Sequence, residues 1–246
     1  MNNVLTLSHI KKDYDSSNGI INAIKDISFT IHEGEIISLV GTSGCGKSTL
    51  LNILSSIETQ TSGTYTYQKT NPTIGYMLQT DSLFPWLTIE ENARLGLKIQ
   101  NKQDQETINN LLSIYHLQDF KDKYPTELSG GMKQRVALIR TLAIKPDILL
   151  LDEPFSALDY QTKLNMEEDI YKRIKERKIA TILVTHDIAE AISMSDKVIV
   201  LSSRPCTIKK EYDIVLDNPS TPIQNRQDKR FIEYHNQIWK DLETND

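Results

Sequence analysis

Residues 36–54 have the sequence IISLVGTSGCGKSTLLNIL, in which a glycine-rich segment separates two apolar runs. The first run, 36–40, predicts a buried strand, and the run after Thr49 predicts a helix. Residues 41–48 match the pattern G-x-x-x-x-G-K-[ST], whose glycines let backbone N–H groups approach phosphate oxygens. The following helix adds the partial positive charge of its N-terminus. The stretch therefore predicts the strand, phosphate-binding loop and helix of an α/β nucleotide-binding fold.

The residues of this loop have separate expected roles. Lys47 is expected to reach the β- and γ-phosphates of a nucleoside triphosphate, and the Ser48 hydroxyl to ligate Mg²⁺. The other loop residues are expected to contact the nucleotide, and they are Gly41, Thr42, Ser43, Gly44, Cys45, Gly46 and Thr49. An ordinary glycine-rich turn is the alternative, but such a turn needs no strand before it and no helix after it. On its own, the motif predicts triphosphate binding and no particular reaction.

Three further apolar runs are similar to the strand at 36–40, and they cover residues 148–151, 181–184 and 198–201. Continuous apolar runs separated by helical periodicity are typical of parallel strands that helices cover on both faces. Residues 4–31 differ, because apolar and polar side chains alternate there around a polar loop at 15–19. Alternation predicts antiparallel strands with one wet face. We therefore expect an α/β fold, a P-loop NTPase core with a mainly parallel sheet and an N-terminal antiparallel β subdomain.

The middle of the chain, residues 88–143, contains no strand-like run. Two sets of apolar residues at helical spacing occur there: Ile108, Leu111, Leu112 and Tyr115, then Met132, Val136, Ile139 and Ala143. Pro146 marks the end of the second helix. We expect one domain over residues 1–246, with an α/β core from 1–87 and 144–216. A helical subdomain at 88–143 is inserted into it, and a helical tail follows at 217–246.

An acidic pair, Asp152 and Glu153, follows the apolar run at 148–151. In a parallel sheet both residues lie at the carboxyl end of a strand, beside the phosphate-binding loop if the two strands are neighbours. Asp152 then suits a ligand of Mg²⁺, and Glu153 suits the base that polarises an attacking water. Such a base contributes about 10²–10⁴-fold in rate. The alternative, a solvated strand end, becomes the minor reading once the phosphate loop is present.

The overall composition limits the possible functions. The chain has 246 residues and a formal net charge of -5, without the basic stripe of a nucleic-acid binder. Its apolar runs are too short to cross a bilayer, and its N-terminus lacks a secretory signal. Two cysteines, Cys45 and Cys206, are too few for a disulfide framework or a metal knuckle. We expect a cytoplasmic protein that meets a membrane only through a partner.

Residues 5–204 resemble the ATP-binding subunits of ABC transporters, through the phosphate loop, the acidic pair and several further segments. The loop at 41–49 resembles the Walker A motif, and 148–152 with Glu153 resembles Walker B with its catalytic glutamate. The segment Leu128-Ser129-Gly130-Gly131-Met132 resembles the family signature. The remaining matches are the D-loop Ser156-Ala157-Leu158-Asp159, the Q-loop Gln79, the switch His186 and the A-loop Tyr14. These seven motifs occur in the family's order.

The resemblance implies a mechanism in which ATP lies between two subunits. One subunit supplies Walker A, and the other supplies the Ser129 hydroxyl and the Gly130 and Gly131 amides at a helix N-terminus. Loss of the γ-phosphate then opens the dimer. The family further implies that Gln79 senses Mg²⁺ and water and that His186 hydrogen-bonds the γ-phosphate. It also implies that Asp159 connects the two sites and that Tyr14 stacks on adenine. Met132 departs from the family, whose signature commonly ends in glutamine.

The resemblance also implies partners. Residues 81–88 resemble the cleft that receives a membrane subunit. Together with 151–158, Gln161 and 200–205 they are most similar to nitrate/sulfonate/taurine-type importers, a group that includes importers of pyrimidine precursors. The implied partners are a second ATPase subunit, expected as a homodimer, two transmembrane permease subunits and an extracytoplasmic solute-binding protein. No nucleic-acid partner is expected. This places the chain at the cytoplasmic face of the cell membrane as a peripheral protein.

Other classes remain as alternatives at this stage. A stand-alone exporter ATPase shares the same motifs. A soluble ABC-type ATPase acting on DNA or ribosomes predicts a second ATPase domain, a long coiled coil or a basic surface. A P-loop kinase or GTPase needs no LSGG-type segment, and a GTPase reads its base with an Asn-Lys-x-Asp motif.

Overall fold

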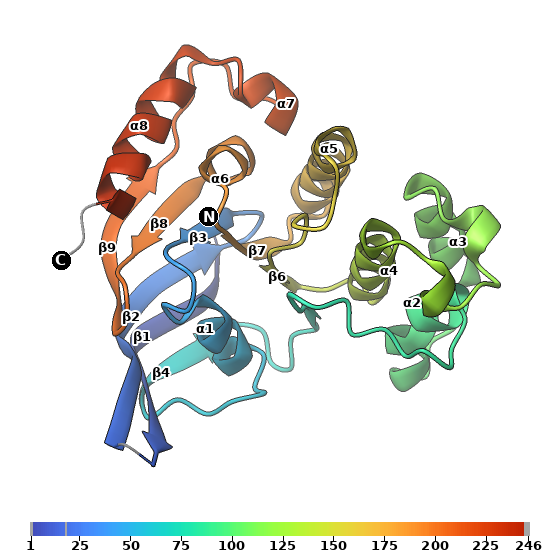
Figure 1. Ribbon diagram of the computed structural model, residues 1–246, viewed down its shortest axis with the longest axis horizontal. Helices are drawn as coiled ribbons and strands as arrows, with labels where there is room; N and C mark the ends of the chain where they lie inside the picture. The colour runs from blue at the N-terminus through green and yellow to red at the C-terminus, as the bar shows by residue number, and fades with distance from the viewer. Residues whose placement is uncertain (1, 18, 244–246) are drawn as a thin grey trace.

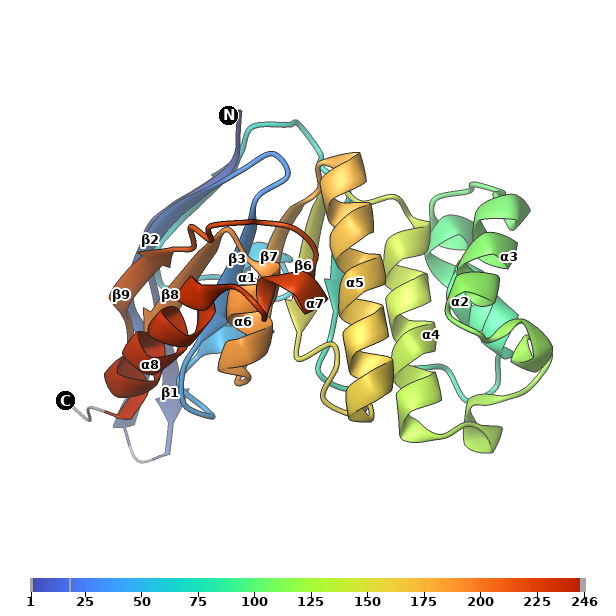
Figure 2. The ribbon, with the colours of Figure 1, turned by 90° about the horizontal axis from the view of Figure 1, so that it is seen from above.

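The computed structural model describes residues 2–17 and 19–243, which form a twisted sheet with helices packed around it (Figures 1 and 2). The described strands form a nine-stranded sheet in the order β4-β1-β2-β9-β8-β3-β7-β6-β5. Their bounds are β1 (Asn3–Ser16), β2 (Gly19–His32), β3 (Ile36–Val40), β4 (Ser62–Tyr67), β5 (Ile74–Met77), β6 (Ile148–Asp152), β7 (Ala180–Thr185), β8 (Lys197–Leu201) and β9 (Cys206–Asp213).

The α-helices are α1 (Lys47–Leu54), α2 (Ile89–Ile99), α3 (Gln105–Ile114), α4 (Gly130–Ala143), α5 (Tyr160–Arg177), α6 (Ile188–Met194), α7 (Pro222–Asn225) and α8 (Lys229–Glu243). Short 3-10 turns occur at Gln118–Phe120 and Pro125–Glu127. In the part of the chain that the structure describes, no helix combines the length and apolar character needed to cross a bilayer.

The parallel part of the sheet separates two apolar clusters. Strands β3, β6 and β7 are buried at every position and pair in parallel, as their continuous apolar runs predicted. Successive residues of β6 face opposite sides. Leu149 and Leu151 pack in the cluster that holds α4 and α5, and Ile148 and Leu150 in the cluster that holds α1 and the inner faces of β1 and β2. The predicted fold class is confirmed.

The N-terminal strands are antiparallel, with β1 between β2 and β4. Alternate side chains such as Leu5 and Leu7 are buried, which is the one-sided burial that alternation predicted. The polar loop predicted at 15–19 is wrong in its bounds. The ladder continues until Ser16 pairs with Gly19, because backbone pairing in a hairpin does not need apolar side chains.

Residues 88–143 contain α2, α3 and α4, which lie together at one end of the molecule (Figure 2). Ile108, Leu111 and Leu112 form the buried face of α3, at the spacing seen in the sequence. Helix α4 begins at the Ser129 cap and ends before Pro146. In the C-terminal segment, α8 lies within the predicted helical tail and buries Ile238 against α6 and β8.

The irregular part of the pairing between β1 and β4 provides a test of the packing. A Cβ at Gly63, where φ is 84°, would lie 2.1 Å from the carbonyl oxygen of His9. We expect Gly63→Ala to lower the free energy of unfolding by about 2–4 kcal/mol, from backbone strain plus collision. Gly19→Ala is the matched control, because φ is 109° but a Cβ there meets nothing within 4 Å. Chemical denaturation should show the smaller loss for the control, and equal losses would contradict the collision.

Candidate active site

The loop between β3 and α1 depends on glycines for its shape. Gly44 and Gly46 have φ angles of 75° and 127°, which residues with a Cβ rarely adopt. A Cβ at Gly46 would also lie 3.1 Å from the Ala23 carbonyl oxygen and 3.3 Å from the Cβ of Cys206. Both the backbone conformation and the close packing therefore require glycine at position 46.

Lys47 lies inside this loop. Its Nζ donates hydrogen bonds to the carbonyl oxygens of Gly41 at 2.7 Å and Thr42 at 3.0 Å, and the residue is 7% exposed. No side chain caps the N-terminus of α1, whose first N–H groups are therefore free to bind an anion. The loop thus combines an ammonium group with an uncapped helix N-terminus, which suits a phosphate group.

A cavity of about 130 Å³ opens beside the loop. Three separate segments bring predicted site residues to its lining, together with one unpredicted residue, Arg204. The lining residues are Ser43, Gly44, Gly46, Lys47, Ser48, Thr49, Gln79, Asp152, Glu153 and Arg204. The predicted Gly41, Thr42 and Cys45 do not line it. The Cys45 side chain packs into the apolar cluster beneath the loop, which leaves only its backbone for a phosphate contact.

Asp152 ends β6 and brings a carboxylate to Ser48. The residue is 3% exposed, and burial raises the pKa of the carboxyl, although a hydrogen bond with Ser48 opposes the shift. Carboxylate, hydroxyl and amide oxygens of Asp152, Ser48 and Gln79 therefore face one cavity. Hard oxygen donors of this kind suit Mg²⁺.

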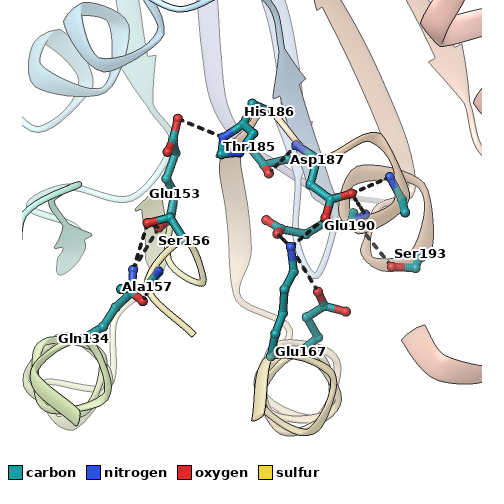
Figure 3. Close-up of polar contacts among 12 residues, drawn as sticks. Gln134, Glu153, Ser156, Ala157, Glu167, Thr185, His186, Asp187, Glu190 and Ser193 are labelled. Atoms are coloured by element: carbon teal, nitrogen blue, oxygen red, sulfur yellow. Dashed lines mark hydrogen bonds and ion pairs between the residues drawn. The ribbon is translucent and has the colours of Figure 1, made fainter. Parts of the chain in front are cut away.

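Glu153 is held in an unusual backbone conformation. Its φ is 50°, which is uncommon for a residue with a Cβ, and its N–H donates to the Val184 carbonyl at 2.9 Å. Its carboxylate lies 3.3 Å from Nδ1 of His186, which directly follows β7 (Figure 3). Strained backbone that the surroundings hold in place is common at functional sites. The predicted base and the predicted switch histidine are thus in contact.

Gln134 of α4 ties the signature helix to the segment after Glu153. Its side-chain amide donates to the Glu153 carbonyl at 3.0 Å and accepts from the Ala157 N–H at 3.0 Å (Figure 3). Sequence reasoning assigned no role to this residue. Residues two apart on a helix point to different sides, so Gln134 lies opposite the predicted apolar face of Met132 and Val136, and that pattern gave no signal for it.

The signature residues lie outside this cavity. Ser129 caps α4 and accepts a hydrogen bond from the Met132 N–H at 3.3 Å. A Cβ at Gly131 would lie 3.2 Å from the Ala157 carbonyl oxygen, so glycine lets α4 approach the D-loop closely, whereas a Cβ at Gly130 would meet nothing within 4 Å. Asp159 caps α5. Within one chain, these residues are not brought to the phosphate loop (Figure 2).

Tyr14, the predicted adenine platform, also lies outside the cavity lining. Its hydroxyl donates to the Glu58 carboxylate, and Nζ of Lys12 lies 4.8 Å from the centre of its ring. Burial, and next the hydrogen bond to Glu58, raise the pKa of the Tyr14 hydroxyl. The ring is therefore fixed in position by two side chains.

Residues 101–104 read Asn-Lys-Gln-Asp, the motif with which a GTPase would read its base. They connect α2 to α3, which lie at one end of the molecule, away from α1 (Figures 1 and 2). Asp104 there caps α3 by accepting from the Thr107 N–H at 2.9 Å. The motif therefore cannot contact a base held near the phosphate loop, which removes its support for the GTPase alternative.

The chain is similar in sequence to proteins of one family. A family described as "ABC transporter" matches residues 24–156. An uncharacterised ABC transporter ATP-binding protein of Bacillus subtilis is 44% identical over 97% of this chain and 95% of its own length. A nitrate import ATP-binding protein of Synechocystis is 40% identical over 95% of this chain and 93% of its own length.

Among solved structures, a dimeric post-hydrolysis ATP-binding cassette with bound ADP and Pi is similar to this chain. It superposes with a TM-score of 0.79 at 30% identity, covering 86% of this chain and 99% of that one. The fold found here is therefore the fold of an ATP-binding cassette.

Arg204 gives a test of the cavity. Its Nη2 donates to the Gly44 carbonyl at 2.8 Å, so its guanidinium lies next to the phosphate loop. We expect Arg204→Ala to weaken ATP binding about 5- to 10-fold, because one charge-assisted contact is lost, and Arg204→Lys to recover part of it. Titration with a fluorescent ATP analogue measures this, with Lys47→Ala as the control for a larger loss. Wild-type affinity in Arg204→Ala would remove Arg204 from the site.

Proposed function

The chain belongs to the ABC transporter family of ATP-binding proteins, and from this premise we propose that it is the ATP-hydrolysing subunit of an importer for a small solute. The predicted family is confirmed, and with it ATP hydrolysis coupled to transport. We propose that two copies close around ATP and that hydrolysis opens them. One observation carries this proposal: the cavity gathers Lys47, Asp152 and Glu153 but none of the signature residues 128–132.

The binding half of the reaction follows from the loop. Amides of residues 41–49 and the Lys47 ammonium hold the β- and γ-phosphates in this proposal, and Arg204 adds a second cation. Tyr14 supplies a face on which adenine stacks. These groups bind the triphosphate and orient its terminal phosphate toward the ends of β6 and β7.

Mg²⁺ fits the site. Among residues 2–17 and 19–243 no group of three or more His, Cys, Asp or Glu side chains could hold a metal by itself. The cation would therefore share its ligands with the nucleotide, and the Ser48 hydroxyl, the Asp152 carboxylate and the Gln79 amide would hold it on the protein side. When bound, Mg²⁺ supplies neutralising charge to the phosphate oxygens.

Glu153 and His186 are the residues that we propose for the hydrolysis step. In the proposal, the Glu153 carboxylate accepts a proton from the attacking water, and His186 hydrogen-bonds the γ-phosphate. Their 3.3 Å contact places the two side chains on the same side of the site. The strained backbone at Glu153, held by Val184 and Gln134, keeps the carboxylate directed toward the water.

In the proposed dimer, the N-terminus of α4 of one subunit completes the ATP site that the phosphate loop of the other subunit begins. The open space around Gly130 lets a phosphate from the partner subunit approach the amides of Gly130 and Gly131, beside the Ser129 hydroxyl. Asp159, at the start of α5, connects the two sites across the dimer. A structure of a related cassette in dimeric form supports this arrangement.

We further propose that two transmembrane permease subunits and an extracytoplasmic solute-binding protein complete the transporter. The chain then lies peripherally at the cytoplasmic face of the membrane. The helical subdomain at 88–143 presents a docking surface with the loop before it, where Phe84 and Trp86 are exposed and their ring centres lie 5.1 Å apart. Nitrate, a sulfonate or a pyrimidine-type compound is the proposed solute. Nitrate is the solute named for one relative.

Glu153→Gln separates binding from hydrolysis. We expect ATP affinity to remain close to wild type while hydrolysis falls about 10²–10⁴-fold, because the amide cannot accept the proton. ATP should then hold the variant as a dimer, which size-exclusion chromatography with light scattering detects. A variant that hydrolyses ATP at the wild-type rate, or one that stays monomeric with ATP, would sink the proposal for its base or its dimer respectively.

Trp86→Ala tests the membrane partner. We expect the variant to hydrolyse ATP normally in isolation but to lose co-purification with a membrane protein from its native host, because a large buried aromatic often dominates an interface. Trp239→Ala is the matched control, since Trp239 is similarly exposed but lies on α8. Equal recovery of the membrane protein by both variants would place the docking surface elsewhere.

A further inference from the structure

A cluster of charged side chains lies between α5 and α6, behind the loop that carries His186 (Figure 3). Nζ of Lys163, on α5, lies 2.7 Å from Asp187, 2.7 Å from Glu190 and 3.9 Å from Glu167. The Lys163 and Glu190 side chains are 14% and 3% exposed, and that of Glu167 is fully buried. Buried charges are retained only with close partners, so the position of Lys163 is tightly determined.

Asp187 connects this cluster to the loop that carries His186 and restrains that loop. Its Oδ1 accepts from the Ala189 N–H at 2.8 Å and the Glu190 N–H at 3.1 Å, and its Oδ2 accepts from Lys163. Its own N–H donates to the Thr185 hydroxyl at 3.0 Å. His186 is therefore flanked on both sides by residues that are hydrogen-bonded in place.

A residue of the C-terminal segment determines which carboxylates pair with Lys163. Arg226, which directly follows α7, lies 2.8 Å from Glu167, closer than Lys163 does. Arg226 thereby pairs with Glu167, and Lys163 is left to Asp187 and Glu190. Burial alone would raise the pKa of Asp187, but Lys163 and the two N–H groups bring it below its ordinary value. Lys163 therefore favours the charged form of Asp187.

Lys163 also lies one helical turn from Asp159. Asp159 caps α5 by accepting from the Thr162 N–H at 3.0 Å, and the Lys163 N–H donates to the Asp159 carbonyl at 2.9 Å. A shift of the first turn of α5 would therefore move Asp159 and the Lys163 side chain together.

We propose that Lys163 is a positioning residue for ATP hydrolysis, which joins the first turn of α5 to the His186 loop through Asp187. A movement of Asp159 on dimer closure then reaches His186, which sets that residue against the γ-phosphate. The inference rests on the proposed function, because it assumes the roles given there to Asp159 and His186. Nucleotide affinity does not depend on this link, since Lys163 is outside the phosphate cavity.

The test compares Lys163→Met with Lys163→Arg in the 246-residue chain. We expect Lys163→Met to lower kcat about 10- to 100-fold while the Kd for ATP changes less than about twofold, because the geometry and not the binding is lost. Lys163→Arg keeps the charge and should recover most of kcat. Lys175→Met is the matched control on the same helix, since Lys175 pairs with Asp196 at 2.6 Å, away from the switch loop, and should keep wild-type kcat.

A double-mutant cycle with Asp187→Asn tests the route. Asparagine still caps α6 but no longer attracts Lys163. Because Lys163 acts through Asp187, the double variant should have a kcat within about threefold of the slower single variant. If Lys163→Met does not fold, Asp187→Asn alone carries the test, with the same loss of kcat expected.

Three results would overturn the inference: a wild-type kcat in Lys163→Met, losses that multiply in the double variant, or a wild-type kcat in Asp187→Asn. Failure of the proposed function has a different signature. If Glu153→Gln hydrolyses ATP normally, the catalytic roles themselves are wrong, whereas an inactive Glu153→Gln beside a fully active Lys163→Met rejects the Lys163 link alone.

Discussion

Parallel pairing of β3, β7 and β6 in register is the constraint on which the site depends. Val40 pairs with Thr185 and Asp152 pairs with Val184, so the three strands end at the same level. The residues that follow these ends are the phosphate loop, His186 and Glu153. A slip of one residue in either ladder would turn these side chains to the other face of the sheet. The buried apolar strands therefore determine the geometry of the polar groups that follow them in the chain.

The sequence was sufficient for the features of the fold that depend on neighbouring residues in the chain. The apolar runs of β3 and β6 and the glycine pattern of the loop are local signals, and the fold follows from them. Arg204, Gln134 and Lys163 could not be found in this way. Arg204 meets Gly44 across 160 positions in the chain, and Lys163 meets Asp187 across 24, so no periodicity connects the partners. The pairing of Asp15 with Ile20 and of Ser16 with Gly19 was not predicted, because the backbone of a hairpin can pair without apolar side chains.

Two glycines in separate motifs show opposite uses of the same residue. Gly46 is packed from below by β2 and by Cys206, which lets the loop lie close to the sheet. Gly130 has open space around it, which leaves room for a group from outside the chain. The first position serves the internal architecture, and the second is where we propose that a ligand approaches. A glycine-rich motif in a sequence does not distinguish these uses, whereas the structure does.

The pairing of Glu167 with Arg226 has a consequence for synthesis on the ribosome. Glu167 and Glu190 are translated well before Arg226, which comes from a segment 59 positions beyond Glu167. Until that segment emerges, Glu167 lacks the cation that lies 2.8 Å from it in the folded protein, and burying a carboxylate without a close partner is unfavourable. Packing of α5 against α6 is therefore less favourable before Arg226 joins Glu167.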